Sequence, residues 1–237
     1  MAQDKGRTPR TARTATPAAK ARPAGAGAAG GGRGTYAVGD ARRRKILDTA
    51  VEHFARYGFH ASSLARIASD CGITQGGLLH HFRGKEDLLL SVLELSEQHD
   101  VERLFTEPPA SVAEHFLRVV ELAGDNTRRP GIVRMFNNLV GESGDPAHPA
   151  HDYFRQRYAR VLGDTVELLE SGIASGELRP DTDCEGVGRE LLAMMDGLQI
   201  QWILDPAALP DMPQRLRSYL DLRLRSISAT GTGLPPT

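Results

Sequence analysis

Two short helical patterns, separated by a turn of a few residues, constrain the fold of this chain most strongly. In the first, Leu64 to Cys71, apolar residues recur at the i, i+3, i+4, i+7 spacing of one buried helix face. Ser62 or Ser63 can cap this helix, and Gly72 ends it. A helix, a glycine-containing turn and a second helix form the layout of a helix-turn-helix, whose second helix enters the major groove of DNA.

The second helix, Gln75 to His81, contains two adjacent glycines within the stretch TQGGLLHHF, where the threonine is the expected N-cap. A glycine inside a helix costs about 1 kcal/mol relative to alanine. We interpret Gly76 and Gly77 as a bare surface on which the helix backbone approaches DNA closely. Leu78 and Phe82 would anchor the same helix to the core.

A longer helix precedes this pair. Asp40 is its expected N-cap, Gly58 is its expected terminating glycine, and the basic run Arg42–Lys45 lies in its first turns. Its apolar stripe consists of Ile46, Leu47, Ala50, Val51, Phe54 and Ala55. Cations are unfavourable at the start of a helix dipole, so a nearby phosphate backbone would explain the basic run; a solvated charge run explains it equally well.

The segment 42–94, RRRKILDTAVEHFARYGFHASSLARIASDCGITQGGLLHHFRGKEDLLLSVLE, resembles the DNA-binding domain of the TetR (tetracycline-repressor-like) family of bacterial regulators. The features that carry the resemblance are the Gly58 aromatic turn, the Ser62-Ser63 cap, the Ile67-Ala68 pair, Gly72-Ile73-Thr74, and Phe82 followed by Lys85-Glu86. The resemblance implies a three-helix head, with its third helix in the major groove, on an all-helical body that dimerises and binds an effector.

The resemblance also implies which residues contact DNA. Ser63 and Thr74 match hydroxyl residues that cap helices and touch phosphate, and Lys85 matches a basic residue that grips the backbone. Gln75, Gly77 and His80 match positions that face base edges or the backbone. The full expected contact set is Ser63, Thr74, Gln75, Gly76, Gly77, Leu79, His80, His81 and Lys85.

Several of these positions depart from the family pattern. Gly77 stands where the family often has threonine, Leu79 where it usually has tyrosine, and His81 where a second aromatic is common; Ala65 replaces an arginine that reads guanine in some members. The operator sequence therefore does not transfer from relatives. Gln75 can bond adenine in a bidentate manner, and Leu79 can contact a thymine methyl group if it points outward. A plain surface glutamine and an inward-packed leucine are the alternatives.

Beyond Lys85 the apolar residues follow a helical period throughout, so the expected fold class is all-α. The expected helices span residues 85–105, 110–123, 128–142, 150–175, 184–204 and 211–228. We divide the chain into a disordered basic tail (1–39), a helix-turn-helix head (40–87), a helical ligand-binding and dimerisation body (88–228) and a flexible tail (229–237).

Charge is distributed unevenly along the chain. Residues 1–39 carry seven Lys or Arg residues, one Asp, and no Ile, Leu, Phe or Trp, whereas residues 88–237 carry fourteen basic and twenty-three acidic residues. The basic end is where a polyanion would bind. The tail either adds phosphate contacts or serves only as a solubilising leader.

The last two helices are apolar on more than one face, and the family resemblance makes them the expected interface of a homodimer. An effector cavity is expected among the middle helices, with apolar walls and a few polar groups. Its expected lining residues are Phe105, Phe116, Met135, Phe136, Asn137, Leu139, Tyr153, Phe154, Tyr158, Met194, Met195, Gln199 and Trp202, although such a stripe is also what a plain core looks like.

Other chemistry finds little support in the sequence. Cys71 and Cys184 suggest reduced thiols in a cytoplasmic protein, and no apolar run is long enough for a membrane span. His80 and His81 point about 100° apart on a helix, and the His148, His151 and Asp152 group has no fourth ligand, so no metal site or cofactor is expected. No nucleophile elbow, phosphate-binding loop or catalytic carboxylate pair is recognisable.

Together these features predict a homodimeric regulator that binds double-stranded operator DNA. We expect a repressor that leaves a pseudo-palindromic operator when a small apolar or amphipathic effector occupies the body. A DNA-binding regulator without an effector is the alternative, and an all-helical enzyme is a third reading.

Overall fold

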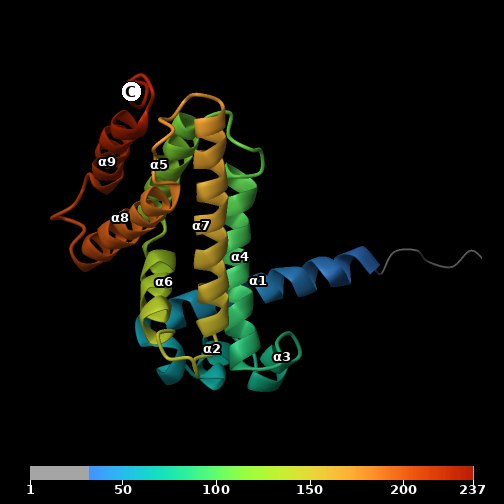
Figure 1. The fold of residues 1–237 in the computed structure, drawn as a ribbon. Helices are drawn as coiled ribbons and strands as arrows, with labels where there is room; N and C mark the ends of the chain where they lie inside the picture. The colour runs from blue at the N-terminus through green and yellow to red at the C-terminus, as the bar shows by residue number, and fades with distance from the viewer. Residues whose placement is uncertain (1–31, 237) are drawn as a thin grey trace, which may run out of the picture. The chain divides into compact units, whose positions relative to one another are not determined.

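The structure, a computed structural model, describes residues 32–236, with side chains from residue 39 onward. Within this range every regular element is a helix, which confirms the all-α fold class (Figure 1). The helices are α1 (Gly32–Ala61), α2 (Leu64–Asp70), α3 (Gln75–Leu79), α4 (Lys85–Leu104), α5 (Val112–Arg128), α6 (Pro130–Glu142), α7 (His151–Ala174), α8 (Cys184–Leu204) and α9 (Met212–Ile227). The chain divides into two units, residues 1–38 and 39–237, and the head and body both belong to the second.

The first helix starts earlier than expected. It begins at Gly32, so Asp40 lies inside the helix and does not cap it. The segment between Gly32 and Asp40 contains no proline, so it is able to continue the helix. The expectation of disorder in residues 1–39 falls mostly outside the described residues; residues 32–39 are helical.

The predicted break at Gly58 is present. Its φ of 69° and ψ of −173° are not helical, and the chain resumes a short helical stretch before Ala61. Such a positive φ favours glycine, which has no Cβ to clash with the backbone. The kink directs the chain from α1 into the turn that leads to α2.

The boundaries of the body helices agree with the sequence pattern to within two residues for α4, α6, α7, α8 and α9. Only α5 differs more, because Gly124, Asp125 and Asn126, which we expected to separate two helices, lie inside it. Asp125 is buried and forms ion pairs with Arg103 and Arg128. These contacts stabilise a last turn that the local sequence does not favour.

The hydrophobic interior consists of two clusters. The first joins the head to the lower parts of α4, α6 and α7, through residues such as Phe54, Phe82, Leu89, Met135 and Phe154. The second lies between α5, α7, α8 and α9. Because α4 runs without a break through the expected boundary at residues 87 and 88, the head does not have a core separate from the body.

The C-terminal residues differ from the expected flexible tail. Leu234 is 6% exposed and packs in the second cluster, and its backbone N–H donates to Asp221 Oδ1 at 2.8 Å. An isolated β-bridge joins Leu178 to Ser228. The segment 229–236 therefore folds back on α9, which no local pattern predicted. No helix among the described residues is long and apolar enough to cross a membrane.

Candidate DNA-binding surface

Helix α3 ends at Leu79, two residues earlier than expected, and together with its capping residues Thr74 and His80 it carries six of the nine expected contact residues. Gln75, Leu79 and His80 are exposed, whereas Leu78 is fully buried beneath them. The Thr74 side chain accepts a hydrogen bond from the Gly77 N–H at 3.1 Å, as predicted for the N-cap. Leu79 is 43% exposed, so it points outward and remains available to a thymine methyl group.

The two glycines of α3 are not required by packing inside the protein. A Cβ built on Gly76 would lie 3.9 Å from Thr74 Oγ1, and one built on Gly77 would lie 3.4 Å from the same atom, which is ordinary van der Waals contact. Neither glycine has a positive φ. Packing and backbone conformation within the described residues therefore do not require glycine at either position.

An open hollow of about 680 Å³ borders this face of α3. Its walls come from α1, the end of α2, the turn, α3 and the two histidines after α3: Arg42, Ser69, Gly72, Ile73, Thr74, Gly77, His80 and His81. Four of the expected contact residues line it. Gly72, at the centre of the turn, has a φ of 73°, which explains why a glycine stands there.

Of the positions expected to contact phosphate, some are free to do so and others are not. Ser63 is the exposed N-cap residue of α2, and its hydroxyl makes no capping hydrogen bond, which leaves it available. The basic residues 42–45 are exposed, and the Arg43 guanidinium lies 4.9 Å from the centre of the Phe82 ring. Arg42 thus adds positive charge to the hollow that it lines, and the other three basic residues follow it along α1.

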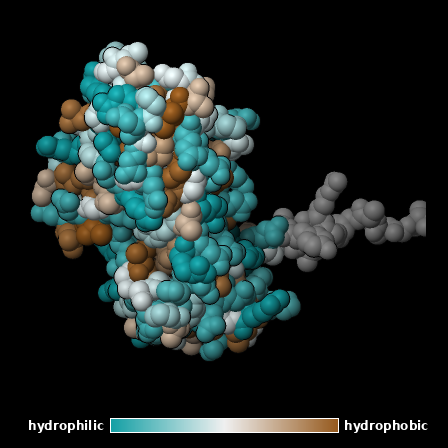
Figure 2. Space-filling view, in the orientation of Figure 1, coloured by the Kyte–Doolittle hydropathy of each residue, from teal (hydrophilic) through white to brown (hydrophobic). Residues whose placement is uncertain are grey.

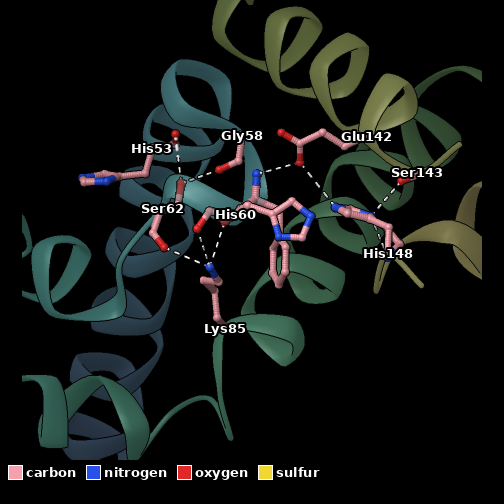
Figure 3. Close-up of polar contacts among 10 residues, drawn as sticks. His53, Gly58, His60, Ser62, Lys85, Glu142, Ser143 and His148 are labelled. Atoms are coloured by element: carbon pink, nitrogen blue, oxygen red, sulfur yellow. Dashed lines mark hydrogen bonds and ion pairs between the residues drawn. The ribbon is translucent and has the colours of Figure 1, made fainter. Parts of the chain in front are cut away.

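Lys85 is placed differently from the other members of the expected contact set. Its Nζ donates to the backbone carbonyls of Phe59 at 2.9 Å, His60 at 3.2 Å and Ser62 at 3.0 Å (Figure 3). An ammonium group has three N–H donors, so all of them are used within the chain. Lys85 therefore fastens the turn after α1 to the start of α4, a role that the family resemblance did not imply.

The histidines that we considered as metal ligands have structural partners. His148 Nδ1 accepts from the Ala150 N–H at 3.2 Å and lies 3.0 Å from Ser143 Oγ, and His151 Nδ1 lies 2.9 Å from the Ser143 carbonyl. The described residues contain no group of three or more His, Cys, Asp or Glu side chains with metal-binding geometry. Burial lowers the pKa of His148, which favours the neutral ring that this loop needs.

The expected effector-lining residues do not form one group. Met135, Phe136, Leu139, Tyr153, Phe154 and Tyr158 belong to the first cluster, whereas Phe116, Met194, Met195 and Trp202 belong to the second. Phe105 lies beside His115, Gln199 is 7% exposed, and the Asn137 amide nitrogen is buried without a hydrogen-bond partner. The two clusters thus divide the apolar residues that the sequence pattern placed in a single pocket.

Polar side chains that sequence reasoning missed lie among these residues. The Tyr158 hydroxyl donates to Asp196 Oδ2 at 2.6 Å, and burial raises the pKa of that carboxyl group, opposed by Tyr158 and Arg157. The Arg157 guanidinium lies 4.7 Å from the centre of the Phe136 ring. Asp196 directly follows two methionines on the most apolar helix of the body. A carboxylate in such an apolar stretch was the sequence signal that could have identified it.

The comparisons with known proteins agree with this geometry. Residues 46–92 match the sequence model of the bacterial regulatory proteins of the tetR family, and residues 126–225 match that of the BetI-type transcriptional repressor C-terminal region. A helix-turn-helix transcriptional repressor from Mycobacterium tuberculosis is 28% identical over 194 residues, covering 79% of this chain and 93% of the relative. The regulator SrpR from Pseudomonas putida is 29% identical over 153 residues, covering 65% and 71%.

Solved structures show the same fold. A TetR-family transcriptional regulator from Streptomyces coelicolor superposes with a TM-score of 0.66 at 27% identity, covering 80% of this chain and 97% of that one. A transcriptional regulator from Saccharomonospora viridis in complex with choline gives a TM-score of 0.63 at 27% identity, covering 80% and 98%. The matched family models, the shared fold and the exposed recognition helix agree, and the chain belongs to the TetR family of DNA-binding transcriptional regulators.

Proposed function

We propose that this protein is a homodimeric repressor that leaves a pseudo-palindromic operator when a small molecule binds its body. The observation that carries the proposal is the exposed face of α3, where Gln75, Leu79 and His80 surround two glycines that no internal contact requires. Gln75 and His80 would contact base edges, while Ser63 and the basic residues 42–45 of α1 would contact phosphates. Such a regulator works in the cytoplasm, where its operator lies.

The effector that fits the body best is small and amphipathic. Tyr158 and Asp196 supply partly buried polar groups and Asn137 a buried amide nitrogen beside aromatic rings, the combination that orients a largely apolar ligand. The similar regulator from Saccharomonospora viridis is a complex with choline, which makes choline a suitable first probe. Its cationic head would meet aromatic faces and the Asp196 carboxylate.

The DNA-binding part of the proposal is tested with purified protein and the DNA upstream of its own coding sequence. Binding should weaken steeply as salt rises, because basic residues that contact phosphates release counterions. A scrambled duplex of the same length should bind more weakly than the upstream duplex. Equal affinity for the two duplexes would contradict a role as a site-specific regulator.

The effector part is tested by thermal shift with choline and a metabolite library, with and without the upstream duplex. A ligand that raises the melting temperature and also weakens DNA binding identifies a ligand-gated repressor, because coupling between two sites is reciprocal. A library without any such ligand would favour a regulator that needs no effector.

A further inference from the structure

Helix α6 contacts the end of α1 at the place where the α1 kink interrupts the helix. In an unbroken helix the N–H of Phe59 would donate to the carbonyl of Ala55, four residues earlier. The non-helical conformation of Gly58 lies between these two groups and breaks the pattern. The Phe59 N–H and the Ala55 carbonyl instead form hydrogen bonds with side chains of α6.

The two contacts are matched in their spacing. The Phe59 N–H donates to Glu142 Oε2 at 2.8 Å, and Asn138 Nδ2 donates to the Ala55 carbonyl at 2.9 Å (Figure 3 shows the Glu142 contact). Asn138 and Glu142 are four residues apart and so lie on one face of α6, while their partners, Ala55 and Phe59, lie on either side of the kink. One face of α6 therefore replaces the hydrogen bond that the kink removes.

The glycine at the kink makes room for this arrangement. A Cβ built on Gly58 would overlap the Glu142 carboxylate. His148 lies beside the carboxylate, with its Nε2 at 3.4 Å from Glu142 Oε2. Because His148 Nδ1 accepts from a backbone N–H, the proton of the neutral ring is on Nε2, which is buried without a hydrogen bond among the described residues.

The same turn is held from the opposite direction by α4. Lys85 binds the carbonyls of Phe59, His60 and Ser62, while Ser62 Oγ donates to the Gly58 carbonyl at 2.6 Å (Figure 3). The segment 58–62 is therefore attached to α6 through an N–H and to α4 through its carbonyls. It leads directly into α2, which packs on α3.

We propose that Asn138 and Glu142 are positioning residues that hold the α1 kink on the body and so fix the orientation of α3 for site-specific DNA binding. This inference rests on the proposed DNA-binding function.

The test uses the full chain with Glu142→Ala and Glu142→Gln. Glutamine places a carbonyl oxygen where Oε2 accepts from Phe59, so it should preserve the contact, whereas alanine leaves that N–H without its partner. Glu167→Ala on α7 is the matched control, since it removes an exposed carboxylate of the same kind from another body helix. Asn138→Ala is a second, independent variant. It removes the amide that donates to the Ala55 carbonyl, which is the other contact of the pair.

Two measurements are combined. Hydrogen exchange of the Phe59 amide should be at least about tenfold faster in Glu142→Ala than in the wild type, and near wild type in Glu142→Gln and Glu167→Ala. Affinity for the upstream duplex should fall about tenfold in Glu142→Ala and also fall in Asn138→Ala, while affinity for a scrambled duplex stays unchanged. The salt dependence should not change, because neither residue touches phosphate.

The outcomes separate the inference from the function on which it rests. Equal weakening on both duplexes, or a Glu142→Gln variant as weak as Glu142→Ala, would overturn the positioning role. A Phe59 amide that exchanges freely in the wild type would overturn the contact itself. A wild-type protein that does not distinguish the two duplexes would refute the proposed function instead, whatever the exchange result.

Discussion

At the scale of single residues, the two glycines of α3 are expected to affect the stability of the protein and its DNA binding in different ways. Gly77 has a negative φ and room for a Cβ, so alanine fits without strain. Replacing glycine by alanine inside a helix stabilises it by roughly 0.5–1 kcal/mol. If Gly77 is present to let the backbone approach DNA, the same change brings no gain in binding.

We therefore predict that Gly77→Ala raises the free energy of unfolding by up to about 1 kcal/mol and leaves or weakens operator affinity. Urea unfolding and fluorescence anisotropy with the upstream duplex measure the two quantities. Gly124→Ala is the control, because Gly124 lies inside α5 with nothing within 4 Å of a built Cβ. The control should gain stability without any change in affinity; a gain in both quantities for Gly77→Ala would rule out close approach.

The residue scale also shows where family resemblance and structure diverge. Thr74 caps α3 as its position in the pattern predicted, because capping depends only on neighbouring residues. Lys85 occupies the expected position, but its donors are directed to the turn after α1. The partners of a long charged side chain depend on backbone groups that are distant in sequence.

At the scale of elements, α5 contains a half-buried titratable group with a predictable effect on stability. His115 lies 5.8 Å from Phe105 and 6.4 Å from Phe116, measured between ring centres. Burial, with a smaller contribution from Arg118, lowers the pKa of His115 to about 4. Between this value and the ordinary value of 6.5, the unfolded chain binds more protons than the folded chain.

The free energy of unfolding should consequently fall as the pH is lowered from about 6.5 toward 4, by an amount on the order of 3 kcal/mol from this residue. Above pH 6.5 His115 should contribute no pH dependence. His115→Gln should lose less stability than the wild type over the acidic window, as measured by urea unfolding at a series of pH values. Parallel pH profiles for the two proteins would contradict this assignment.

At the scale of the whole molecule, α8 and α9 expose apolar side chains that the single chain leaves uncovered. Leu204 is 78% exposed, Leu222 is 68% exposed and Ile200 is 47% exposed. Figure 2 shows apolar surface on the side of the molecule where α8 lies. These residues support the proposed homodimer interface, since a second copy would bury them.

We predict that Leu222→Glu shifts the protein toward monomers and lowers operator affinity, because two heads must bind two half-sites together. Sedimentation velocity and DNA-binding measurements on the same samples check both effects. Leu95→Glu on α4 is the control, because Leu95 is 42% exposed but lies outside the last two helices. A Leu222→Glu protein with wild-type mass in solution would contradict the proposed interface.

The basic N-terminal residues remain a prediction from sequence, since residues 1–31 lie outside the described part of the chain. Removing residues 1–31 deletes six Lys or Arg residues and leaves α1 intact. If all six contact phosphates, the slope of log affinity against log salt should become shallower by about 5. Titrations at several salt concentrations measure the slope, and an unchanged slope would identify a solubilising leader.

The sequence by itself determined the helical fold class, the boundaries of most helices and the recognition helix with its cap and glycine turn. These features depend on apolar periodicity and on capping residues, which act over a few neighbouring positions. Only the tertiary structure decided the roles of Lys85 and Glu142, the extra turn of α5 and the division of the expected pocket between two clusters. Glu142 and Phe59 are 83 positions apart, and no local pattern encodes a hydrogen bond over that distance.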